Sequence, residues 1–112
     1  MEESILISIK KLLGIAADYT NFDTDIIIHI NSAFMILNQL GLGPKEGFSI
    51  ENDKNIWSEF VQDMDKFSAV KTYVYLKVKM VFDPPLGSAV MESMKQSINE
   101  LEWRLNVQSE SL

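Results

Sequence analysis

Few side chains in this chain have the type and spacing needed for acid–base or metal chemistry. Asp23 and Asp25 form a D-x-D pair, but the glycine and the downstream glutamate of a calcium-binding loop do not follow. Asp63 and Asp65 repeat this spacing. We interpret these residues as helix-boundary residues, with Asp65 opening a helix. The single histidine, His29, has no second histidine or cysteine near it, so we do not expect it to be a metal ligand or a general base.

Nucleophilic and phosphate-binding chemistry is equally poorly represented. The chain has no cysteine, which excludes disulfides, thiolate zinc sites and cysteine nucleophiles. The run Gly41-Leu42-Gly43-Pro44-Lys45 follows a helical pattern and lacks the GK[ST] ending of a phosphate loop, so we interpret it as a helix end and a turn. We therefore expect no enzyme activity and no cofactor. A small hydrolase or metal enzyme would need several acidic side chains that meet in one site, in addition to the aspartates that we assign to helix boundaries.

Composition limits the classes of partner. The 112 residues suit one domain, with 16 acidic against 10 basic residues and a net charge of −6. Nucleic-acid affinity comes mainly from Lys and Arg, so tight DNA binding is not expected. No run approaches the ~18 apolar residues of a membrane span, and the start Met1-Glu2-Glu3-Ser4 is acidic where a signal peptide would be basic. We expect a protein made in the cytoplasm with no membrane contact.

Glycine and proline divide the chain into helical segments. The breaks fall at Gly14, at residues 41–44, at residues 83–85 and at Gly87. Apolar residues at helical spacing predict helices over about 3–13, 24–40, 66–82 and 88–106, with a short helix at 56–62. Asp23 or Thr24 is the expected cap of the second helix. The predicted fold is all-α: a small bundle of four to five helices.

Two segments lack helical periodicity. Residues 47–51 alternate apolar and polar side chains, which is compatible with a short extended segment or hairpin arm within 45–55. The C-terminal end has no period, so we predict one domain over 1–106 and a flexible tail over 107–112. The residues of this predicted tail are Val107, Gln108, Ser109, Glu110, Ser111 and Leu112.

Several apolar side chains are not needed by the predicted core. Ile28 and Met35 share a face opposite the main stripe of their helix, and Trp103 lies opposite the stripe of the last helix. The helix over 66–82 is apolar on two flanks, one containing Tyr73, with Lys77 between them. Single exposed apolar residues are normal, a central helix can be apolar all round, and a lysine stem can lie on apolar surface. Together these residues favour an oligomer or a docked partner and are our candidate contact residues.

Three stretches of the chain resemble a known family. They are DTDIIIHINSA at 23–33 with NQLGLGP at 38–44 and Gly47-Phe48, VKTYVYLKV at 70–78 with FDPP at 82–85, and INELEWRLN at 98–106. In this order and spacing they resemble the head–tail connector proteins of tailed bacteriophages and of related prophages in Gram-positive bacteria.

The resemblance implies a structural protein of the virion neck. Members of that family form a ring, commonly of about twelve copies, beneath the portal at the capsid vertex. The ring extends the channel through which DNA is packaged and ejected, without sequence-specific binding, and docks the next tail-side component. By position, the tail 107–112 and the loop 41–55 are the candidates for reaching the portal or a neighbouring subunit. The alternative is a small helical adaptor or regulator that binds a host or phage protein.

Overall fold

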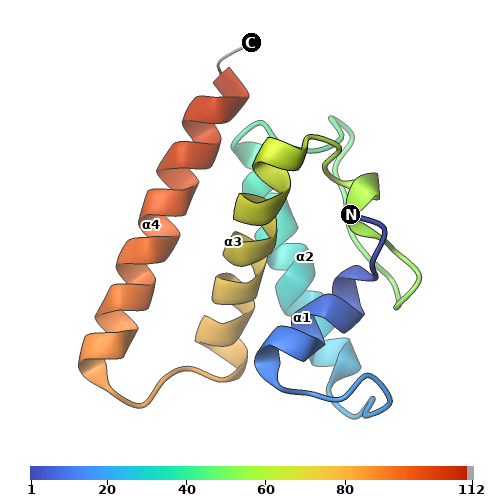
Figure 1. Ribbon diagram of the computed structural model, residues 1–112, viewed down its shortest axis with the longest axis vertical. Coiled ribbons are helices and arrows are strands. Elements are labelled where there is room, and N and C mark those ends of the chain that lie inside the picture. The colour runs from blue at the N-terminus through green and yellow to red at the C-terminus, as the bar shows by residue number, and fades with distance from the viewer. Residues whose placement is uncertain (111–112) are drawn as a thin grey trace.

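The computed structural model describes residues 1–110, so Ser111 and Leu112 of the predicted tail lie outside the described residues. Within residues 1–110 the chain forms helices and no strand (Figure 1). The elements are α1 (Ile5–Leu13), α2 (Asp23–Gln39), the 3-10 turn η1 (Trp57–Glu59), α3 (Met64–Phe82) and α4 (Ser88–Glu110). The predicted all-α bundle is confirmed, and the expected short fifth helix is a single 3-10 turn.

Local signals account for the boundaries of α1. The side chain of Ser4 accepts a hydrogen bond from the Ile7 amide at 3.2 Å, so it caps the N-terminal end. Gly14 follows the helix with a φ of +82°, a left-handed conformation that glycine adopts without a steric penalty. The predicted end of this helix at Gly14 is confirmed.

Two predicted caps are corrected. The residue before α2 is Phe22, whose side chain makes no capping bond, and Asp23 lies inside the first turn. Neither Asp23 nor Thr24 is therefore the cap. At α3 the cap is Asp63, whose carboxylate accepts from the Asp65 amide at 2.8 Å, so Asp65 is inside the helix that it was expected to open. Both helices therefore begin one or two residues earlier than predicted, which is the usual uncertainty of a helix boundary.

The helices form a flat bundle with α3 in the middle. The molecule measures 40 × 36 × 20 Å, which is about two helix diameters thick. Figure 1 shows α4 alongside α3 at one edge, with α1 and the N-terminus on the other side of α3 and α2 behind it. The interior is built from α1, α2, α3 and η1. Its buried apolar side chains include Ile5, Ile9, Ile26, Ile30, Phe34, Leu37, Trp57, Val70, Val74 and Val78.

The long connection between α2 and α3 covers this interior, and residues 45–55, which were compatible with a short extended segment or a hairpin arm, form no strand. The Asn31 side chain accepts from the Ile50 amide at 2.8 Å and donates to the Ile50 carbonyl at 3.0 Å. A side chain of α2 thus takes both backbone bonds that a strand partner would make. Phe48 and Phe60 pack on Phe34, with ring centroids 5.0 and 4.5 Å away. The segment is an irregular loop held by one asparagine and an aromatic cluster.

The C-terminal end of α4 also differs from prediction. The helix was expected to end near Asn106, but it continues through Glu110. The hydroxyl of Ser109 donates to the Leu40 carbonyl at 2.6 Å, and the Asn106 amide lies 3.4 Å from the same oxygen. These polar contacts with the end of α2 stabilise the last turns of α4. Those turns have no apolar periodicity, so the sequence pattern did not predict that they are helical.

Candidate functional site

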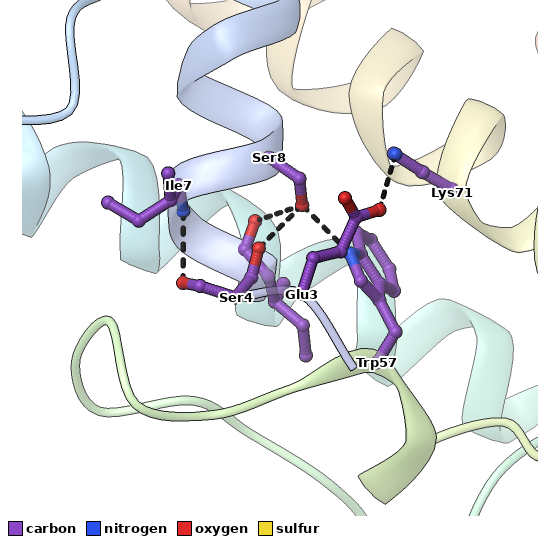
Figure 2. Close-up of polar contacts among 7 residues, drawn as sticks. Glu3, Ser4, Ile7, Ser8, Trp57 and Lys71 are labelled. Atoms are coloured by element: carbon purple, nitrogen blue, oxygen red, sulfur yellow. Dashed lines mark hydrogen bonds and ion pairs between the residues drawn. The ribbon is translucent and has the colours of Figure 1, made fainter. Parts of the chain in front are cut away.

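A polar cluster joins α1 to η1 (Figure 2). The indole nitrogen of Trp57 donates to the Ser8 hydroxyl at 2.8 Å, and both side chains are buried. That hydroxyl in turn lies 2.6 Å from the Ser4 carbonyl and 3.1 Å from the Ile5 carbonyl. No acidic or histidine side chain among those that the structure describes, in residues 1–109, bonds Ser8. It is therefore a satisfied structural hydroxyl and not an activated nucleophile.

The start of the chain is fastened beside this cluster. Lys71 of α3 donates to the Glu3 carboxylate at 2.6 Å, and its ammonium lies 5.8 Å from the centre of the Phe67 ring. The Ile5 amide donates to the Asn55 carbonyl at 3.0 Å. These contacts connect residues far apart in sequence, so they brace the N-terminus against α3 and against the loop before η1.

A buried ion pair holds the connection between α1 and α2, and the sequence analysis missed it. The side chain of Lys10 is fully buried and its ammonium lies 2.8 Å from the Asp23 carboxylate. The same ammonium donates to the carbonyls of Ala17 at 3.1 Å and Tyr19 at 2.7 Å. The position of Lys10 in the sequence could have indicated its burial, because it lies three residues before Leu13 and beside the apolar stripe of α1. The cluster orders a loop and offers no open coordination site.

Tyr73 is corrected as a contact residue. Its side chain is fully buried inside the protomer, and its hydroxyl donates to the Glu102 carboxylate at 2.6 Å. Burial, and then the hydrogen bond and the negative charge of Glu102, raise the pKa of Tyr73 well above its usual range. The second apolar flank of α3, to which Tyr73 belongs, packs against α4. Tyr73 itself is therefore covered by α4 of its own chain.

Three other candidates do point away from the interior. The side chains of Ile28, Met35 and Trp103 are 56%, 58% and 66% exposed. The prediction that they lie opposite the core stripes of α2 and α4 is confirmed. Large apolar side chains exposed on two helices leave two surfaces of the protomer unburied.

Lys77 lies between two adjacent hollows that meet on α3. Its side chain is half-buried and makes no ion pair or hydrogen bond within residues 1–110. One hollow, of ≈ 230 Å³, lies against α2, and the other, of ≈ 270 Å³, lies against α4. Both include Lys77 and Met80; the first adds His29, Ser32, Ile36 and Val81, and the second adds Lys95, Ile98, Asn99 and Glu102.

Neither metal binding nor membrane insertion is indicated by the part of the chain that the structure describes. Within residues 1–110, no three acidic or histidine side chains gather where they could hold a metal ion. No helix in this range has the length and apolar character to cross a bilayer. The described surface offers apolar patches and several hollows, of which the two around Lys77 adjoin a sequence-predicted contact residue.

Comparison with known families gives one finding. The family model described as phage connector protein matches residues 5–111, from the first residue of α1 to beyond the end of α4. Comparisons with curated proteins and with solved structures give no significant match. The match spans every helix described above, including both surfaces that remain unburied.

Proposed function

This chain belongs to the phage connector protein family, and we propose that it is a structural head–tail connector without enzyme activity. In this proposal about twelve copies form a ring beneath the portal, in the neck of the virion. The ring extends the DNA channel and docks the next tail-side component. The chain is made in the host cytoplasm and joins the virion on assembly.

The observation that carries the proposal is a pair of different exposed apolar surfaces. A head-to-tail ring needs two distinct faces on each subunit, because each copy contacts its two neighbours with different patches. Ile28 and Met35 supply one candidate face on α2, and Trp103 supplies another on α4. Tryptophan is enriched among the residues that dominate binding energy at interfaces, so its exposure in an isolated subunit supports a contact role.

The charge distribution supports a channel wall that does not grip DNA. The chain has a net charge of −6 and one arginine. Several of its cations already pair with carboxylates: Lys10 with Asp23, Lys71 with Glu3, Lys79 with Asp83, Lys95 with Glu92 and Arg104 with Glu100. Phosphate contacts need cations that can displace counterions, and these cations are already paired.

For the contact with the portal we propose one end of the molecule. The loop 41–55 and the C-terminal residues 107–112 lie in the segments that the resemblance associates with docking. The bond from Ser109 to the Leu40 carbonyl brings the last turn of α4 to the start of this loop. The last described turn of α4 and the start of the loop therefore lie side by side, which supports a shared contact with the portal or with a neighbouring subunit.

The test is assembly on the portal. Wild type, Trp103→Ala and Met64→Ala would each be mixed with purified portal and measured by sedimentation and native mass spectrometry. Met64 is as exposed as Trp103, at 66%, and serves as the matched control. We expect Trp103→Ala to weaken ring assembly by roughly thirtyfold or more, as for a central interface residue, and Met64→Ala to assemble normally. A wild-type chain that never binds portal would contradict the connector proposal.

A further inference from the structure

The two hollows around Lys77 form a groove across α3 with helical walls, which we call the Lys77 groove. Its floor is Lys77 and Met80, and its walls come from α2 and α4. Ser32 belongs to the α2 wall, and Ile28 and Met35 lie four residues before it and three after it. Residues at these spacings are neighbours on a helix surface. The exposed apolar row on α2 is therefore continuous with the groove.

The groove carries a cation without a partner. Lys77 is half-buried beside apolar side chains such as Met80 and polar ones such as Asn99, and it has no ion pair among the side chains that the structure describes. Lys95 and His29 also line the groove, and its acidic residue is Glu102, two turns after Lys95 on α4, whose carboxylate accepts from Tyr73. A partner that fits must bring both apolar surface and negative charge, because an uncompensated cation is costly to bury.

The outer face of α4 carries an apolar side chain and carboxylates. It is defined here by Glu92, Gln96, Glu100 and Trp103, the last of which is 66% exposed. Glu92 and Glu100 pair with Lys95 and Arg104 of the same helix, but both pairs are exposed, so they are weak and can be exchanged for a buried cation. Eleven residues make about three helical turns, so Glu92 stands on the same side as Trp103, and Glu100 is one turn away. In its own chain α4 is docked through the opposite side, where Ile98 and Leu105 are buried. Glu92 lies beside the groove of its own chain through its ion pair with Lys95, while Trp103 on the same face is 66% exposed.

We propose that the outer face of α4 in one copy packs into the Lys77 groove of the next copy, with Trp103 against the apolar row of α2 and Glu92 toward Lys77. This inference rests on the proposed ring and names the two surfaces that meet in it. The contact is head-to-tail, because the groove and the outer face are different surfaces of each chain. It leaves a free groove at one end of any open chain of copies and a free α4 face at the other.

Disulfide trapping tests the pairing directly, because the chain has no cysteine of its own. A tagged Ser32→Cys chain would be mixed with an untagged Gln96→Cys chain on portal under mild oxidation. Since each chain carries a single cysteine, any disulfide between the two types joins different copies. We expect mixed disulfides in this pair and none when Lys11→Cys on exposed α1 replaces Gln96→Cys. Assembly on portal without the mixed disulfide would overturn the inference and leave the connector role intact.

A double-mutant comparison provides the second measurement. Lys77→Gln and Glu92→Gln should each weaken assembly by about five- to tenfold, with circular dichroism unchanged. If Lys77 and Glu92 contact each other across copies, the double variant should assemble as well as the single variant that assembles less well. Losses that multiply would show that the two residues act at separate places and would contradict the pairing. Failure of wild type itself to assemble would reject the proposed function as well.

Discussion

The first three helices and α4 are stabilised in different ways. The helices α1, α2 and α3 pack around one shared interior, in which the side chains of Phe34 and Trp57 are completely buried. In the 23-residue α4, the described side chains that are buried are Ile98 and Leu105, and most of the others face outward. One region thus forms a self-contained core, while the other is an edge helix whose larger surface is available to a partner.

The polar contacts follow the same division. In the core region, Lys10 and Asn31 satisfy backbone groups of two loops, so each is part of the local fold. In α4, Glu102 and Ser109 make single contacts to α3 and to the end of α2. Buried polar groups that organise loops are costly to remove, whereas single attachments of an edge helix are cheaper. The comparison therefore predicts a ranking of effects on stability.

The largest effect should come from the enclosed aromatic of the core. Trp57→Ala removes a fully buried indole and its bond to Ser8, and we expect a loss of about 4–5 kcal/mol in the free energy of unfolding. The size-matched pair is Leu37→Ala in the core, expected to cost about 4 kcal/mol, and Leu105→Ala on α4, expected to cost about 2–3 kcal/mol. Urea denaturation followed by circular dichroism measures all three. Equal losses would contradict the difference between the two regions, because the packing of α4 would then contribute as much to stability as the packing of the core.

The buried ion pair should rank next. Lys10→Met leaves the Asp23 carboxylate and the carbonyls of Ala17 and Tyr19 without their donor, and we expect about 3 kcal/mol of destabilisation. Lys11→Met changes an exposed lysine one residue later and should stay within about 0.5 kcal/mol. Thermal unfolding of the two variants gives the difference. A Lys10→Met protein as stable as Lys11→Met would show that the ion pair does not organise the loop.

A pair of glycines tests whether the loop after α2 belongs to the core. Gly43 and Gly47 both have left-handed φ, +76° and +95°, so alanine is strained at either position. At Gly43 a Cβ would also overlap the Phe60 ring, while at Gly47 it meets nothing within 4 Å. We expect Gly43→Ala to cost more than about 2 kcal/mol and Gly47→Ala about 1 kcal/mol. Equal melting temperatures would indicate a loop that moves independently of the aromatic cluster.

The smallest effect concerns the bond between the two regions. Tyr73→Phe removes the donor to Glu102 and should cost about 1 kcal/mol near neutral pH. The pKa of Tyr73 is raised above the ordinary value of 10.0, so its neutral form stabilises the fold fully below about pH 10. That contribution is lost as the pH rises further, because the unfolded chain then ionises more readily than the folded one.

Unfolding curves collected between about pH 9 and 11 measure this dependence. Wild type should lose stability more steeply than Tyr73→Phe over that range. If Tyr73→Phe and wild type show the same slope, the hydroxyl does not hold α4 through its neutral form.

Much of the fold could be predicted because its signals are local. Gly14, Gly41 and the Pro84-Pro85 pair end helices through backbone conformation alone, and the apolar period marks the segments between them. The exposure of Ile28, Met35 and Trp103 also followed from their positions on the helix. The role of Tyr73 did not, since an apolar flank looks the same whether a helix of the same chain or of another chain covers it.

The order of the residues alone determined that this chain is helical, where the main breaks fall and which side chains each helix turns away from its own stripe. These properties depend on helix geometry and on residues a few positions apart. The tertiary structure decided that Lys10 is buried, that Asn31 replaces a strand partner for Ile50 and that α4 continues to Glu110. Each of these contacts joins groups that only the packed helices bring within hydrogen-bonding distance, so no local pattern encodes them.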